Sequence, residues 1–154
     1  MEQVNATALV SVRASRLSLT VLASDGKLYF VKLRASGGCM GSKALAYKII
    51  KHCGVQTVEP TVVTFSEDFV RQARAQHKLE DSSSIPAGSH FGSQYPADPQ
   101  STPIFDFFPQ NLAGRIENIE DLAKMRTLDA WIANPTPGQA IFVGQKNKGY
   151  KAHM

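Results

Sequence analysis

Residues 16–34, RLSLTVLASDGKLYFVKLR, decide the fold of the first part of the chain. The run 16–22 alternates apolar and polar side chains, which is typical of a half-buried β-strand. Asp25-Gly26 is a strong signal for a tight turn, and the run 27–34 after it again indicates a strand. With the β-rich run 6–12 before it, this stretch predicts a two-strand meander and a third strand.

Lys32 is the most informative single residue of this stretch. In a strand over 27–34, it shares one face with Leu28 and Phe30, and the apolar residues between them form the other face. A lysine on an otherwise apolar face either reaches the edge of the sheet, where its ammonium group meets water, or binds an anion. From the strand alternation, we expect Lys32 to project into a cleft beneath the sheet rather than into bulk solvent.

The rest of the chain mixes helices and strands, which predicts the α+β class. Apolar spacing and capping residues predict helices over 42–53, 67–79 and 118–133, begun by Ser42, Ser66 and Asn118. Short apolar runs predict strands over 61–65, 104–108, 139–143 and 150–154. No strand follows the last of these to pair with it, so we expect a chain cut inside an element.

Residues 81–103 differ in composition from the rest of the chain. They contain six serines, four prolines and two glycines, with few aliphatic residues. A segment of this length without regular structure is either functional or mobile, and it can mark the border between two subdomains. We therefore expect 81–103 to be the least regular part of the chain.

Length and composition exclude several classes of protein. A chain of 154 residues allows one domain and hardly two, and a hydrophobic fraction of 43% excludes intrinsic disorder. No apolar run approaches the length of a transmembrane helix, and the first residues lack the pattern of a secretory signal, so no membrane partner is expected. Cys39 and Cys53 form no CxxC pair, which favours a reduced cytoplasmic protein.

The net charge of +4 is unevenly distributed along the chain. Residues 1–60 hold 8 Lys or Arg against 3 Asp or Glu. Such an excess suits a phosphate-bearing ligand, either a nucleotide or a nucleic acid, although a solvated surface of mixed charge explains it as well. Glycines 37, 38 and 41 could hold phosphate through backbone N–H groups, but they match no phosphate-loop motif and equally suit a flexible connector.

The aromatic cluster at 105–108 also has two interpretations. Phe105, Phe107 and Phe108, with Tyr95, could stack on nucleic-acid bases. The phenylalanines lie on an apolar run, however, and this favours a place in the hydrophobic core.

Five segments, taken in order, resemble the HipA-like kinase family, a bacterial branch of the protein-kinase-like fold. They are DGKLYFVKL at 25–33, GVQTVEP at 54–60, SHFGS at 89–93, IFDFFP at 104–109 and LDAWIAN at 128–134. The resemblance implies a kinase N-lobe over about 1–103, a hinge over 104–109 and the start of a C-lobe over 110–154.

The resemblance also implies a site for ATP and Mg²⁺. Lys32 would hold the phosphates of ATP, as the strand lysine of a protein kinase does. Backbone groups of the hinge, at Phe105, Asp106 and Phe107, would meet the adenine. Asn134 and the residues after it would form the catalytic loop.

The chain departs from the family pattern at three places. Thr136 stands where the family has the aspartate that acts as the catalytic base, and a hydroxyl cannot replace a carboxylate as proton acceptor near neutral pH. Lys48 stands at the place of the acid that pairs with the strand lysine. The metal-binding aspartate would come just after Met154.

We therefore expect a kinase-type protein, of the lineage that transfers phosphate from ATP to a protein hydroxyl, which is inactive or incomplete as this chain. The alternative is a pseudokinase or a nucleotide-binding regulatory module. Either would bind a nucleotide and could act on, or be regulated by, a protein partner. A basic module associated with nucleic acid is a third hypothesis, which rests on the charge of residues 1–60 alone.

Overall fold

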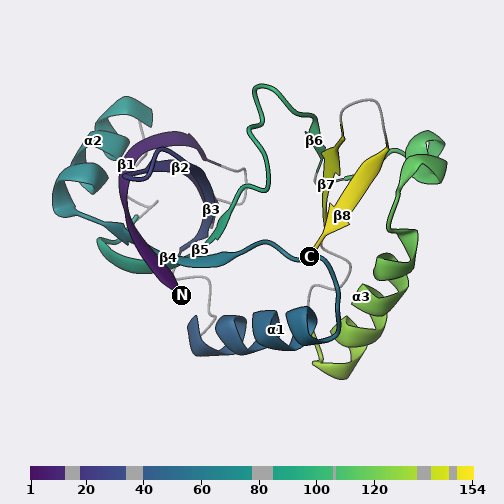
Figure 1. Cartoon of the computed structure of the whole chain (residues 1–154). Helices are drawn as coiled ribbons and strands as arrows, with labels where there is room; N and C mark the ends of the chain where they lie inside the picture. The colour runs from purple at the N-terminus through teal and green to yellow at the C-terminus, as the bar shows by residue number, and fades with distance from the viewer. Residues whose placement is uncertain (13–17, 34–39, 78–84, 106, 135–139, 146–148) are drawn as a thin grey trace. The chain divides into compact units, whose positions relative to one another are not determined.

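The computed structural model describes the chain except for residues 13–17, 34–39, 78–84, 106, 135–139 and 146–148. The fold is of mixed α+β type, as the sequence predicts. The chain divides into two compact units (Figure 1). Unit 1 comprises Met1–Ala44 and Glu59–Tyr95, and unit 2 comprises Leu45–Val58 and Pro96–Met154.

Unit 1 is built on a closed β-barrel, visible as a ring of strands in Figure 1. Its neighbouring strands are, in order, β1 (Glu2–Val12), β2 (Ser18–Ala23), β3 (Leu28–Lys32), β5 (Gly88–Gln94) and β4 (Pro60–Phe65). The strands pair antiparallel except for β1 and β4, whose parallel pairing closes the barrel. Helix α2 (Glu67–His77) packs its apolar face on the barrel core. Ser66 caps this helix as predicted, because its Oγ accepts a hydrogen bond from the backbone N of Phe69 at 3.1 Å.

The predicted meander is confirmed by β2 and β3. Asp25 accepts a hydrogen bond from the backbone N of Lys27 at 3.1 Å, and Gly26 adopts the positive φ of 77° that this turn needs. On β3, Tyr29 and Val31 are fully buried in the barrel, whereas Lys32 is only half-buried. The alternation read from the sequence is therefore correct.

The expectation that 81–103 lacks regular structure is wrong for Gly88–Gln94, which forms β5 between β3 and β4. This strand buries His90 and Gly92 instead of aliphatic residues. The His90 ring lies 4.5 Å from that of Phe65, and its Nε2 lies 2.9 Å from the carbonyl oxygen of Pro86. A Cβ on Gly92 would lie 2.6 Å from Val63, so only glycine fits the barrel here without rearrangement. Unit 1 ends at Tyr95, and residues 96–103 belong to unit 2.

Unit 2 contains a small antiparallel sheet and a helix. The sheet has the order β6 (Ile104–Phe105), β7 (Ile141–Gly144) and β8 (Tyr150–His153). Helix α3 (Ile119–Trp131) follows the short helix η2 (Gln110–Arg115) and shares the core of unit 2 with Phe142 and Ala152. Helix α1 (Met40–His52) runs from unit 1 into unit 2. It begins at Met40, so Ser42 lies in its first turn and is not the cap that the sequence predicts.

Asn118 holds β8 instead of capping α3. Its side chain makes no cap hydrogen bond. It donates through Nδ2 to the carbonyl oxygen of Ala152 at 2.9 Å and accepts from the Ala152 backbone N through Oδ1 at 2.8 Å. The amide thus pairs with β8 as a neighbouring strand would, which explains why the predicted cap is absent.

Asp121 accepts a hydrogen bond from Asn118, and we call these two residues with Lys124 the Asp121 cluster. We expect this cluster to make a pH-dependent contribution to stability. Burial of its carboxyl group opposes ionisation, but hydrogen bonds from Asn118 and Lys124 outweigh burial and hold the pKa of Asp121 below its ordinary value of 3.8. A lowered pKa in the folded state stabilises the fold above about pH 4, and this contribution is lost as the pH falls through the folded-state pKa.

We expect Asp121→Asn to lower the free energy of unfolding by about 1–3 kcal/mol at pH 7, because hydrogen bonds to a charged group are weakened. Urea denaturation should show this difference narrowing toward pH 3. Asp68→Asn is the matched control, because Asp68 is 73% exposed in its ion pair with Arg71. Equal losses from both substitutions, or a loss that grows toward acid pH, would show that the Asp121 cluster does not stabilise the fold.

Candidate functional site

Lys32 and Lys43 form a pair of cations on the outside of unit 1, called here the lysine pair. Lys32 is paired in register with Phe91 on β5. Lys43, in the first turn of α1, places its Nζ 5.5 Å from the centre of the Phe91 ring. Both lysines are half-buried. The space beneath the sheet is the packed barrel core rather than the expected cleft, so Lys32 lies on the outer face.

The two charges of the lysine pair repel each other. Burial lowers the pKa of Lys43, and the positive charge of Lys32 lowers it further. In the part of the chain that the structure describes, no carboxylate forms an ion pair with either lysine. An anion placed between the two ammonium groups would remove the repulsion.

Two lysines of α1 bear on the position of the acid that the resemblance implies. Lys48 is exposed, and the α1 residue whose charge acts on Lys32 is Lys43. The two α1 lysines are five residues apart, which separates them by about 140° around the helix axis.

The expected hinge residues do not share one surface. Phe105 packs in the core of unit 2, with its ring centre 5.8 Å from that of Tyr150 and 6.4 Å from that of Phe108. Phe107 is 79% exposed, and Asp106 lies outside the described residues. The core interpretation of the aromatic cluster therefore holds for Phe105 and Phe108 but not for Phe107.

Asn134 is held by the buried end of α3. Its Nδ2 donates to Oδ1 of Asp129 at 2.6 Å, and its backbone N donates to the Asp129 carbonyl oxygen at 2.8 Å. Asp129 is only 1% exposed, so it cannot meet a reacting hydroxyl in this arrangement. Ala133 has a φ of 51°, which turns the chain out of the helix before Asn134. Thr136, the residue at the expected base position, lies outside the described residues.

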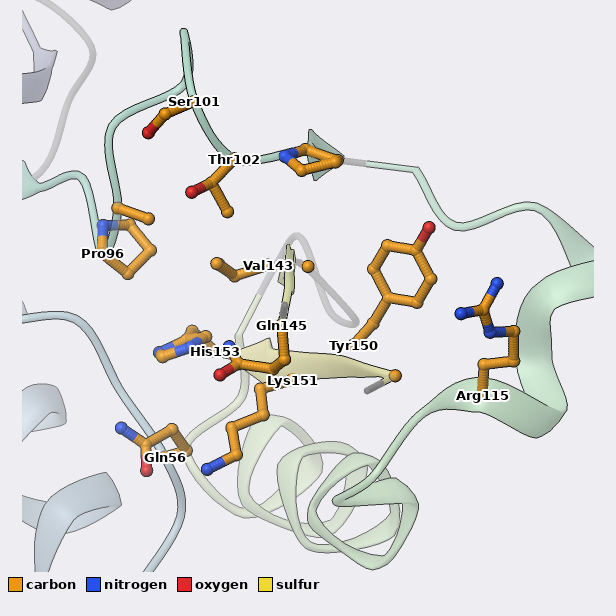
Figure 2. Close-up of a pocket in the computed structure, with 14 residues that line it drawn as sticks. Gln56, Pro96, Ser101, Thr102, Arg115, Val143, Gln145, Tyr150, Lys151 and His153 are labelled. Carbon is orange, nitrogen blue, oxygen red and sulfur yellow. The ribbon is translucent and has the colours of Figure 1, made fainter. Parts of the chain in front are cut away.

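Unit 2 contains an open pocket of about 620 Å³ that the sequence did not reveal. Figure 2 shows Gln145, Lys151 and His153 reaching into it from the β7–β8 hairpin, beside Gln56 and across from the segment that carries Ser101. Lys151 and His153 share a face of β8 because they are two residues apart. In the sequence, the alternation in YKAH was the only local sign of this pocket, because the other lining residues come from distant segments.

The unit-2 pocket is cationic. Arg115, Lys151 and His153 line it, and no Asp or Glu is among its described lining residues. Nδ1 of His153 is buried and has no hydrogen-bond partner among the described residues. Burial lowers the pKa of His153, and the charge of Lys151 lowers it further. Both effects favour the neutral form of the imidazole, so the positive charge of the pocket comes from Arg115 and Lys151.

Comparisons with protein-family models, with curated proteins and with solved structures found no match to this chain. Within the described ranges, no group of three or more His, Cys, Asp or Glu side chains could hold a metal ion. None of the described helices is long and apolar enough to cross a membrane.

Proposed function

We propose that this chain is a nucleotide-binding module of the HipA-like kinase type, which binds ATP through the lysine pair and does not transfer its phosphate. The lysine pair is the observation that carries the proposal. Two half-buried lysines whose charges repel each other, without a carboxylate partner among the described residues, form a site for a group with several negative charges. The triphosphate of ATP is such a group.

The position of the lysine pair supports the kinase-type interpretation. Lys32 lies at the end of β3, and Lys43 lies on the helix that follows. In protein kinases a strand lysine holds the phosphates of ATP, and a helix supplies the residue that faces this lysine. Under this proposal the barrel of unit 1, with α1, corresponds to a kinase N-lobe, and unit 2 supplies the start of a C-lobe.

The same residues argue against phosphoryl transfer. A kinase orients its strand lysine with an acid, whereas Lys43 has the same charge as Lys32 and repels it. Thr136 offers no carboxylate to take the proton of an attacking hydroxyl. The described residues also offer no cluster of acids suited to Mg²⁺, so the proposal assigns no role to a metal. A regulatory module that changes its behaviour when ATP is bound is the function consistent with these features.

Calorimetric titration of the 154-residue chain with ATP, ADP and AMP tests this proposal. We expect affinity to fall in that order, because each phosphate removed takes charge away from the lysine pair. Lys32→Ala and Lys43→Ala should each weaken ATP binding about 10-fold or more, which corresponds to loss of one charge-assisted hydrogen bond.

Lys48→Ala is the matched control for these titrations, because it removes an exposed lysine from the same helix as Lys43. It should bind ATP as the unchanged chain does. Equal affinity for ATP and AMP, or equal weakening by Lys48→Ala and Lys43→Ala, would contradict the assignment of phosphate binding to the lysine pair.

A further inference from the structure

The lysine pair puts one amine beside another around a single aromatic ring. Lys32 and Phe91 are paired in register on β3 and β5, and Nζ of Lys43 lies 5.5 Å from the centre of the Phe91 ring. The positive charge of Lys32 acts on Lys43, so the two groups are close enough to interact. A small molecule whose phosphate binds to Lys32 therefore brings its neighbouring atoms to the amine of Lys43.

We propose that Lys43 is a modification site, which small acyl phosphates acylate and which thereby regulates the lysine pair. This inference rests on the proposed function, because it uses the same phosphate site. Lys32 holds the phosphate group of the acyl phosphate, and the carbonyl carbon then lies beside Nζ of Lys43. Two reacting groups held together in this way react much faster than the same groups free in solution.

The reaction is an acyl transfer from phosphate to nitrogen. The neutral amine of Lys43 attacks the carbonyl carbon with its unshared electron pair, and a C–N bond forms. The bond between this carbon and the phosphate oxygen breaks, and inorganic phosphate leaves with the electron pair while the amine gives up a proton to the solvent. The charge of Lys32 stabilises the negative charge on the leaving phosphate.

The surroundings of Lys43 favour it as the attacking amine. Burial and the charge of Lys32 both lower the pKa of Lys43, which increases the fraction of neutral amine. Among the described residues, no carboxylate forms an ion pair with Lys43 that would hold it in the charged form. Lys48, on the same helix, is exposed to solvent, so it serves as the reference lysine.

Acylation changes what the lysine pair can bind. The ammonium group of Lys43 becomes a neutral amide, so only the charge of Lys32 remains to hold phosphate. We expect the acylated chain to bind ATP about 10-fold more weakly, as Lys43→Ala does. The supply of acyl phosphate would then determine how much of the chain can bind ATP.

Incubation of the whole chain with acetyl phosphate, followed by digestion and mass spectrometry, tests this proposal. We expect Lys43 to be acetylated about 10-fold faster than Lys48, because binding of the phosphate supplies about one charge-assisted hydrogen bond. An excess of ATP should slow the acetylation of Lys43 and leave that of Lys48 unchanged. Lys32→Ala should reduce the rate at Lys43 to that at Lys48.

Calorimetry with ATP on the same preparation separates this proposal from the proposed function. Equal acetylation of Lys43 and Lys48 in a chain that binds ATP would overturn the modification site and leave the proposed function standing. Equal acetylation without ATP binding would overturn both. Selective acetylation of Lys43 that neither ATP nor Lys32→Ala slows would overturn the role given to the phosphate site.

Discussion

Replacing Gly149 with alanine is expected to destabilise unit 2 and to distort its pocket. A Cβ built on Gly149 would overlap the backbone carbonyl oxygen of Arg115, which is not the end of a flexible side chain and cannot turn aside. Gly149 also donates its backbone N to Oε1 of Glu117 at 3.2 Å and accepts at its carbonyl oxygen from the Gln145 backbone N at 3.0 Å. The start of β8 and the end of η2 would have to separate.

Overpacking of this kind costs about 1–3 kcal/mol, and we expect the upper end of that range because the overlap is with the backbone. Urea denaturation of Gly149→Ala measures the loss. Gly114→Ala is the matched control, because a Cβ at Gly114 meets nothing within 4 Å. If the two variants lose the same free energy of unfolding, the close approach at Gly149 does not hold unit 2 together.

Phosphoryl transfer by the 154-residue chain is expected to be negligible. Loss of the general base alone lowers a rate about 10²–10⁴-fold, and Thr136 cannot supply a carboxylate. Under the proposed function, Lys43 repels Lys32, whereas a kinase uses an acid to orient its strand lysine, and this costs rate again because phosphoryl transfer depends on positioning and charge. These losses act on one catalytic unit and need not multiply.

Release of labelled phosphate from ATP, with Mg²⁺ present, measures this prediction. We expect no release above that of the buffer, and no labelled protein. Thr136→Val should leave the result unchanged, since the threonine has no part in it. Robust Mg²⁺-dependent turnover that Lys32→Ala abolishes would contradict the proposal that the chain only binds ATP.

Local patterns in the sequence predict much of the fold. The alternation around Asp25-Gly26 predicts β2 and β3, and it correctly places Lys32 on the face opposite Tyr29. Alternation and turn residues suffice there because both strands have one apolar face. They fail for β5, whose buried positions are His90 and Gly92. The side chain of Val63 occupies the space that a side chain at position 92 would need. Val63 belongs to β4, which is distant in the sequence, so no local pattern reveals this requirement.

The site was less predictable than the fold, again for physical reasons. Lys32 stands out because a lysine among apolar residues needs an explanation. Its companion Lys43 does not stand out, because which α1 lysine acts on Lys32 depends on where the helix begins and how it is rotated. The unit-2 pocket is assembled from Gln56, residues near 100, Arg115 and the β7–β8 hairpin, and no local pattern joins these segments.

Labelling with an ATP acyl-phosphate reagent tests the central claim most directly. The reagent transfers its acyl group from the phosphate end to a lysine amine that lies against the phosphates, and mass spectrometry identifies the lysine. The proposed function predicts acylation of Lys32 or Lys43 that an excess of ATP prevents, with no protection at the exposed Lys48. Absence of ATP-protected labelling at both members of the lysine pair, or equal protection at Lys48, would contradict it.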